Sequence, residues 1–239
     1  MHLMTLRERL NRPKISKIES LQRSSFVRLV KSLGLDSSSA ALSVSCGDGI
    51  WDYFLLESTP VRKIIATDIV SCPVAPTEQE FLRARGTWDF VGVGTDNKLP
   101  FADNLFDFVY HQDVIEHVEN PYEFLREQYR VLRKGGAILV GTPNLFRPMN
   151  LMRLMLGRLN FPIKIGENSE IGDYVHVQEF YEQQMKLLLT SVGFELVEIA
   201  PVYFGIHSPF DICFSKYPAS CLARTMSHFI TYVCKKPVR

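Results

Sequence analysis

Hydrophobic positions along the chain form short apolar runs separated by segments of helical periodicity. Short apolar runs bounded by turn residues are typical of buried strands, and seven of them cover residues 40–46, 62–68, 88–94, 106–112, 137–142, 194–204 and 227–237. Because most of these strands alternate with helical segments, the pattern predicts an α/β fold with a mostly parallel sheet and helices on both faces. The last two strands have less helix between them, which favours an antiparallel strand at one edge.

The clearest helical segments carry their own start and stop signals. Residues 120–136 begin with an Asn-Pro pair, which suits a cap followed by a first helical position, and Gly135 is expected to end this helix. Residues 180–194 place apolar side chains on one face and end at Gly193. The basic segment 1–34 is also helical in pattern, and we interpret it as an N-terminal helical cap whose arginines and lysines face solvent.

Composition places few restrictions on the function. The 239 residues are 46% hydrophobic and 22% charged, as in ordinary globular proteins, and we interpret residues 1–239 as one domain. A net charge of +1 gives no bias toward nucleic acid. The five cysteines include no CxxC pair, so reduced thiols in the cytoplasm are expected. The first residues are charged where a signal peptide is apolar, and no run reaches the ~18 apolar residues of a membrane-spanning helix.

The segment SVSCGDG, residues 43–49, follows the first predicted strand and has the pattern of a cofactor-binding loop. Gly47 and Gly49 allow positive φ angles and let a ligand approach the backbone closely. Asp68 ends the second strand, where a carboxylate can bind both hydroxyls of a ribose. The third glycine of the dinucleotide fingerprint is missing, because bulky residues and an acid follow Gly49. A nucleoside without a pyrophosphate therefore fits better than NAD, which counts against a dehydrogenase.

A long block gives the chain a family resemblance. Residues 99–144 read LPFADNLFDFVYHQDVIEHVENPYEFLREQYRVLRKGGAILVGTPN, and they follow the glycine loop and Asp68 in order. With this block the chain resembles the class I S-adenosylmethionine-dependent methyltransferases over about residues 40–200. It is most similar to the group that includes quinone-biosynthesis and surface-polysaccharide methyltransferases. The resemblance implies a Rossmann-like fold of seven strands, S-adenosylmethionine as cofactor and a small-molecule acceptor.

The resemblance also implies the cofactor contacts. They come from the ends of the first four strands: Ser43, Ser45, Cys46, Gly47, Gly49, Asp68, Ile69, Thr95, Asp96, His111 and Gln112. The two glycines would lie along the methionine part of the cofactor, and Asp68 would bind the ribose. Thr95 or Asp96 would meet the adenine amino group, while His111 and Gln112 would contribute backbone.

Two serines depart from the family pattern. The family commonly has an acid at the position of Ser43 and a glycine at that of Ser45. Ser43 is expected to hydrogen-bond the cofactor's ammonium group through its hydroxyl or a water, without charge assistance. Ser45 brings a small side chain toward the cofactor, so we expect weakened binding. These two positions also motivate the alternative that the protein is a catalytically inactive binding or scaffold protein.

Histidine is the side chain best suited to deprotonate an acceptor near neutral pH. His117 lies just after the fourth predicted strand, and His176 lies at the end of a long connection. Both are candidate bases, with a purely structural role as the alternative for each. No group of residues has metal-ligand spacing along the sequence, so no metal is predicted.

The connection after the fifth strand, residues 145–178, is long enough to be a lid over the acceptor. It combines apolar and basic residues, including three methionines, which adapt to irregular apolar surfaces. We interpret it as a helical lid, with a helix packed on the core as the alternative. Its basic residues are candidates for holding a phosphate or carboxylate of the acceptor, or anionic lipid headgroups in a peripheral membrane contact: Arg147, Arg153, Arg158 and Lys164.

A nucleic-acid methyltransferase fits the sequence less well. Amino-methylating DNA enzymes of this class carry Asn or Asp followed by Pro-Pro and an aromatic residue after the fourth strand, whereas residues 111–114 read HQDV. The near-zero net charge points the same way. The leading prediction is therefore methyl transfer to an oxygen, nitrogen or carbon atom of a small molecule.

Overall fold

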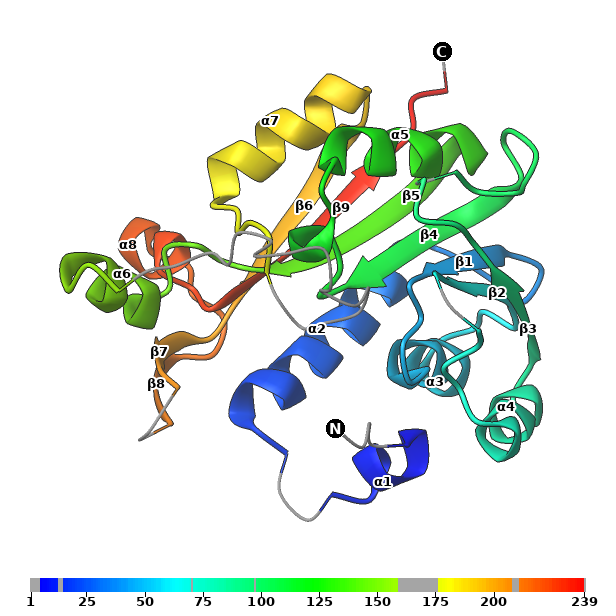
Figure 1. Ribbon diagram of the computed structural model, residues 1–239, viewed down its shortest axis with the longest axis horizontal. Coiled ribbons are helices and arrows are strands. Elements are labelled where there is room, and N and C mark those ends of the chain that lie inside the picture. The colour runs from blue at the N-terminus through cyan, green and yellow to red at the C-terminus, as the bar shows by residue number, and fades with distance from the viewer. Residues whose placement is uncertain are drawn as a thin grey trace, which may run out of the picture.

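A seven-stranded sheet forms the centre of the part of the chain that the structure describes (Figure 1). The computed structural model describes residues 5–12, 15–69, 71–96, 98–158, 176–207 and 211–238. The strands of this sheet are β1 Ala40–Val44, β2 Lys63–Asp68, β3 Thr87–Gly92, β4 Phe106–Gln112, β5 Leu132–Pro143, β6 Glu195–Val202 and β9 Phe229–Lys235. Their spatial order is β3-β2-β1-β4-β5-β9-β6. All seven predicted strands are confirmed.

The antiparallel strand is β9, and it lies one place in from the edge. It pairs antiparallel with β5 on one side and with β6 on the other, so β6 forms the edge. The prediction of an antiparallel strand was right, but its position at the edge was wrong. The burial of the two strands gives the physical reason. Residues 229–234 are all buried, as in a central strand, whereas the first three residues of β6 are exposed.

Helices cover both faces of the sheet, as predicted (Figure 1). On one face lie α2 Lys17–Ser32, α3 Ile50–Ser58 and α4 Pro76–Arg83, and on the other α5 Pro121–Val131 and α7 Glu182–Val192. Alternate strand residues supply the two cores, since successive side chains of a strand point to opposite faces. Ala41 packs in the core with α2 and α3, while its neighbour Leu42 packs in the core with α5 and α7.

Two helix ends test the predicted stop signals. Helix α7 ends at Gly193, whose φ of 111° is in the left-handed region. Helix α5 starts as predicted, with the Asn120 side chain accepting a hydrogen bond from the backbone of Glu123. It ends at Val131, earlier than predicted, because the chain enters β5 at Leu132. Gly135 therefore lies in a strand, where its N–H donates to a carbonyl next to β9.

A small subdomain between β6 and β9 was missed from the sequence. It holds the hairpin of β7 Phe204–Ile206 and β8 Ile212–Ser215, followed by helix α8 Cys221–Thr225. Helix α6 Pro148–Met155, from the predicted lid, lies beside β7. Residues 159–175 of that lid are outside the described residues, so the lid stays a prediction. Among the described helices, none is both long and apolar enough to span a bilayer.

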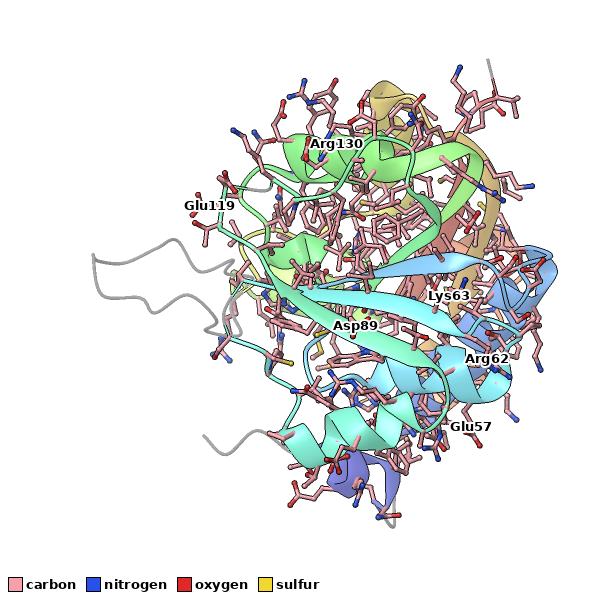
Figure 2. The ribbon with its side chains drawn as sticks, turned by 90° about the vertical axis from the view of Figure 1, so that its right-hand side faces the viewer. Glu57, Arg62, Lys63, Asp89, Glu119 and Arg130 are labelled. Atoms are coloured by element: carbon pink, nitrogen blue, oxygen red, sulfur yellow. The ribbon has the colours of Figure 1, made fainter. Side chains whose placement is uncertain are left out.

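The described part of the N-terminal segment is helical, as predicted, with α1 Leu6–Leu10 preceding α2. Figure 2 shows the two ends of the sheet on opposite sides of the view, with Arg62 and Lys63 at the start of β2 and Glu119 beyond the end of β4. In parallel sheets ligands bind outside the carboxyl ends of the strands. The side of the molecule near Glu119 is therefore where the candidate site is to be sought.

Candidate functional site

The loop after β1 is held in an unusual backbone conformation. Ser45, Gly47 and Gly49 all have positive φ angles, of 55°, 52° and 79°. The backbone N–H of Cys46 donates to the carbonyl of Thr67 in β2 at 2.9 Å, which ties the loop to the neighbouring strand. A Cβ at Gly47 would meet nothing within 4 Å, so its positive φ, and not close packing, is what favours glycine at this position. Ser45 adopts the same left-handed region at a cost of about 1 kcal/mol or more.

Asp68 joins the loop to the end of β2. One carboxylate oxygen accepts from the backbone N–H of Gly47 at 3.1 Å, and the other accepts from Ile69 at 2.8 Å. Asp68 is half-buried and Ile69 is exposed. Each carboxylate oxygen can accept a second hydrogen bond, so Asp68 can bind hydroxyls while it holds the loop. The structure brings these predicted residues together.

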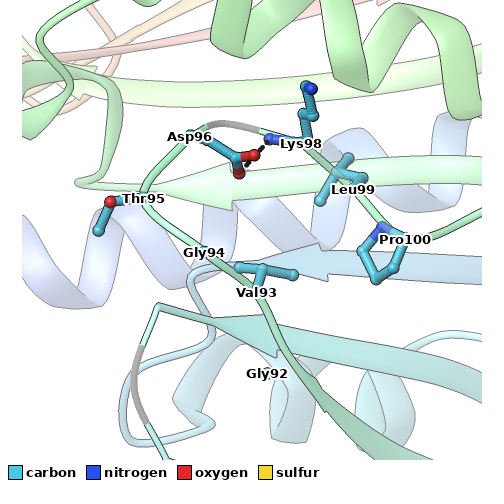
Figure 3. Close-up of a pocket in the computed structure, with 8 residues that line it drawn as sticks. All are labelled: Gly92, Val93, Gly94, Thr95, Asp96, Lys98, Leu99 and Pro100. Atoms are coloured by element: carbon cyan, nitrogen blue, oxygen red, sulfur yellow. Dashed lines mark hydrogen bonds between the residues drawn. The ribbon is translucent and has the colours of Figure 1, made fainter.

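A hollow opens beside Asp68, at the carboxyl end of β3. It has a volume of about 660 Å³ and is lined by residues 92–96 and 98–100 (Figure 3). The backbone N–H of Val93 donates to the Asp68 carbonyl at 2.9 Å, so the hollow begins next to that acid. Thr95 and Asp96 are both exposed in it, and an Asp96 carboxylate oxygen accepts from the backbone N–H of Lys98 at 3.2 Å. Both residues that the resemblance assigns to the adenine therefore lie in a cavity.

Ser43 is buried away from the loop surface, which corrects the prediction made for it. Its hydroxyl donates to Asp52 Oδ1 at 2.6 Å, and the side chain is 2% exposed. Tyr110 donates to the same oxygen, and the Trp88 indole donates to Oδ2, each at 2.7 Å. Burial raises the pKa of Asp52 to about 6, even though these three hydrogen bonds oppose the shift. The reason is strand alternation, which points Ser43 to the same face as Ala41, toward α3.

His111 and Gln112 are also buried. Neither His111 ring nitrogen forms a hydrogen bond with any of the described residues, and burial lowers the pKa of this histidine to about 3. Its ring packs edge-on against Phe124 at 5.2 Å. The Gln112 side chain lies over Gly141, where an added Cβ would collide with it. Contacts from this pair to a cofactor would thus involve backbone, as the resemblance implies.

The two candidate histidines lie together although 58 residues separate them in the sequence. The ring centroids of His117 and His176 are 4.9 Å apart, with the rings nearly perpendicular. His117 belongs to the short 3₁₀ helix η1 Ile115–His117, which follows β4. The backbone N–H groups of Val177 and Gln178 both donate to the carbonyl of Glu116, and this pairing holds His176 against η1. The contact between the two histidines was not predicted, because the positions of distant residues in the sequence do not show which of them meet in the fold.

Glu116 is the functional candidate that sequence reasoning missed. It is fully buried, and its Oε2 accepts from the Thr142 hydroxyl at 2.9 Å. Its Oε1 has no hydrogen-bond partner among the described residues. Burial, together with the nearby charge of Asp113, raises the pKa of Glu116 well above its usual range. The signal in the sequence was an acid that follows two apolar residues and directly precedes His117. Once such an acid is buried, it must have a partner or a function.

Glu179 fixes the position of His176. Burial alone would raise the pKa of Glu179, but hydrogen bonds from His176 and Arg147 lower it to about 2. His176 Nδ1 lies 2.7 Å from Glu179 Oε1, and Asn150 donates to Oε2 at 2.7 Å. Arg147 forms a bidentate ion pair with the same carboxylate. Arg147 is therefore occupied within the protein, which corrects its assignment as a free cation for the acceptor.

The N-terminal cap reaches the glycine loop. The Arg9 guanidinium donates to both carboxylate oxygens of Asp48, at 3.0 and 3.2 Å, and to Glu19 at 3.0 Å. Asp48 in turn accepts from the backbone N–H of Ile50 at the start of α3. Arg9 was expected to face solvent, and this was wrong because the loop supplies a carboxylate for it.

Comparison with known proteins identifies the domain. Residues 42–140 match the family model described as a methyltransferase domain. The chain carries a methyltransferase domain. With it, the predicted resemblance to the class I S-adenosylmethionine-dependent methyltransferases is confirmed for this segment. The domain spans β1 to β5 and includes the glycine loop, Asp68, the hollow and η1.

Two relatives and one solved structure extend the similarity beyond the methyltransferase domain. A Mycolicibacterium smegmatis protein named "Probable S-adenosylmethionine-dependent methyltransferase" is 29% identical over 69% of this chain and 55% of its own length. Demethylmenaquinone methyltransferase from Geobacillus stearothermophilus is 26% identical over 74% of this chain and 80% of its own. A methyltransferase structure from Aquifex aeolicus superposes with a TM-score of 0.58 at 16% identity, covering 95% of each chain. The chain spans about half the length of the first curated relatives that it matches.

Proposed function

We propose that this protein transfers a methyl group from S-adenosylmethionine to a hydroxyl or amine of a small molecule. The observation that carries the proposal is the hydrogen bond between Asp68 and the backbone of Gly47, which joins a positive-φ loop to a ribose-binding acid. The methyltransferase domain and the names of its relatives support the donor. The methionine part, the ribose and the adenine of the donor would each then have a complementary surface at the carboxyl ends of the strands.

The donor would lie across the carboxyl ends of β1, β2 and β3. The backbone around Gly47 and Gly49 faces the methionine part, Asp68 binds the ribose hydroxyls, and the hollow that holds Thr95 and Asp96 takes the adenine. Ile50 and the buried acid Asp52 begin α3, where a dinucleotide enzyme would bind pyrophosphate. This start of the helix favours a donor without phosphates.

The histidine pair supplies the proton chemistry. The hydrogen bond from His176 Nδ1 to Glu179 leaves Nε2 as the nitrogen that faces other groups. For a hydroxyl acceptor, His117 or His176 would accept the proton as the oxygen attacks the methyl carbon. The methyl–sulfur bond breaks in the same step, and the donor leaves as the neutral thioether. Because the sulfonium is already a good leaving group, alignment of donor and acceptor would supply most of the catalysis.

The acceptor class is proposed from the name of one relative and from the exposed basic residues near the site. One relative is named for a demethylated menaquinone, which supports a quinone-like ring. A sugar or another metabolite fits the same site. Arg153 in α6 and Arg158, which lies three residues after that helix ends, are both exposed and remain candidates for binding an anionic group of the acceptor or of a membrane surface.

A second function is favoured by one observation. Ser45 holds a strained positive φ in the loop that would contact the donor, at a position where the resembled family has glycine. A loop that no longer binds the donor would make the protein a binding or scaffold protein with a methyltransferase fold.

Calorimetric titration with S-adenosylmethionine separates the two functions. We expect saturable binding to the wild-type protein, none with NAD, and at least tenfold weaker binding to Asp68→Ala. Asp89→Ala is the matched control, because Asp89 is an exposed acid within the neighbouring strand β3 (Figure 2). A folded protein, free of carried-over cofactor, that binds neither ligand would overturn the proposal.

A further inference from the structure

Three side chains of metal-ligand type meet at the carboxyl end of β4. One ligand atom from each of Glu116, His117 and His176 lies within 4.8 Å of the other two. Donors at about 2.0–2.2 Å from a tetrahedral ion lie about 3.3–3.6 Å apart. The three atoms lie at most 4.8 Å apart, so rotation of the side chains would bring them closer by up to about 1.5 Å to share one ion.

The carboxylate of Glu116 provides an independent indication of a ligand. It is fully buried, and Oε1 has no partner among the described residues, while Oε2 is held by Thr142. A buried polar atom without a partner costs about 1–3 kcal/mol, and native proteins rarely keep one without a function. The unpaired oxygen belongs to the same residue that approaches the two histidines.

His176 is oriented as metal-binding histidines are. Such a histidine usually gives its second ring nitrogen to a carboxylate, which fixes the ring. Here Nδ1 lies 2.7 Å from Glu179 Oε1, and Glu179 is itself fixed by Arg147 and Asn150. The arrangement leaves Nε2 as the ligating nitrogen and supports it with an outer layer of polar contacts.

We propose that Glu116, His117 and His176 bind one divalent transition-metal ion of the zinc class. Two imidazoles and a carboxylate are the donors of three-ligand zinc sites that keep a position open for a water or substrate. Imidazole donors disfavour magnesium and calcium, which prefer oxygen ligands.

The fourth coordination position of such an ion is free to bind the acceptor, which gives the ion a role in catalysis. This role rests on the proposed methyl transfer. An acceptor hydroxyl bound there has a lower pKa and releases its proton to solvent. The acceptor oxygen would then take the methyl group as the methyl–sulfur bond breaks, and the donor would leave as the thioether. With the ion bound, His117 and His176 would hold the ion, and the ion would replace them in the deprotonation step described for the metal-free pair.

Titration of the chelator-treated full-length protein with Co²⁺ tests the site. Visible absorption reports coordination by nitrogen and oxygen ligands, and calorimetry with Zn²⁺ gives the affinity. We expect one ion per chain, with affinity at least tenfold lower in both Glu116→Gln and His176→Gln. Both replacements retain hydrogen-bonding capacity, and circular dichroism checks their folding. His207→Gln is the matched control, since His207 lies in the β7–β8 hairpin region outside the cluster.

Two results would overturn the metal site: no saturable binding by the folded wild-type protein, or equal affinities in wild type and both cluster variants. The S-adenosylmethionine titration is repeated on the same chelated protein. Donor binding without metal binding overturns this inference and leaves the proposed function standing. Metal binding without donor binding overturns the proposed function and leaves the site itself standing.

Discussion

Two buried carboxylates of the same domain, Asp52 and Glu116, have opposite surroundings. Both are fully buried, and burial raises the pKa of each. Asp52 receives three hydrogen bonds, from Ser43, Trp88 and Tyr110, so both of its oxygens are satisfied. Glu116 receives one side-chain hydrogen bond, from Thr142, and its other oxygen has no partner among the described residues.

The different hydrogen-bond partners of Asp52 and Glu116 indicate a structural role for Asp52 and a functional role for Glu116. The donors to Asp52 come from β1, β3 and β4, so this carboxylate fastens α3 to three strands of the sheet. Glu116 is held by β5 on one side and approaches two histidines on the other. The fully partnered carboxylate of Asp52 stabilises the fold, whereas the partnerless oxygen of Glu116 lies where we propose that a ligand completes the structure.

Loss of the Asp52 carboxylate is expected to have the largest effect. Asp52→Ala leaves three buried donors without an acceptor and should lower the free energy of unfolding by about 3 kcal/mol or more. Urea denaturation measures it. Asp89→Ala, at an exposed acid, should stay within about 0.5 kcal/mol of wild type. Equal effects of the two substitutions would show that the Asp52 network does not stabilise the fold.

Sequence patterns predicted the strands because the burial of a strand shows in the apolar residues of that same short segment. They did not predict that β9 lies between β5 and β6, since the spatial order of strands depends on distant pairings. Asp68 and the glycine loop were predicted because both are strand-end features. The partners of Glu116 and Arg9 were missed, because each contact joins loops or helices far apart in the chain. Ser43 was misassigned because its strand face was not considered.

The pH dependence of stability is expected to carry a signature of Asp52. Its folded pKa of about 6 lies above the ordinary value of 3.8, so the folded state holds the proton more tightly than the unfolded state. Stability from this group is therefore present at low pH and is lost as pH rises from about 4 to about 6, by about 3 kcal/mol. Asp52→Asn should remove this slope, as urea denaturation across that range would measure. An unchanged slope would contradict the assignment.

Metal should stabilise the protein through Glu116 and not through Asp52. At a free Zn²⁺ concentration of about 100 Kd, binding adds about 2.7 kcal/mol to the free energy of unfolding. Thermal denaturation should show this rise for wild type and for Asp52→Asn but lose it in Glu116→Gln. A rise retained in Glu116→Gln would place the ion elsewhere and remove the contrast between the two acids.

The smallest expected effect concerns the strained serine. Ser45→Gly should relieve the backbone strain of a non-glycine residue at a φ of 55°. Once the entropic cost of the more flexible glycine in the unfolded chain is subtracted, the free energy of unfolding should rise by about 0.5–1 kcal/mol. It should also tighten binding of S-adenosylmethionine, because the added side chain is removed from the loop. Denaturation and calorimetry report the two effects separately. Weaker donor binding in Ser45→Gly would instead assign the hydroxyl a direct contact.

The central claim is that the glycine loop with Asp68 and the cluster of Glu116, His117 and His176 are two parts of one site. A crystal structure with S-adenosylhomocysteine bound tests it most directly. We predict that the ribose hydroxyls lie on Asp68, the adenine lies in the hollow after β3, and the sulfur faces the cluster. A nucleoside bound elsewhere, or a sulfur that faces away from His117 and His176, would contradict the account.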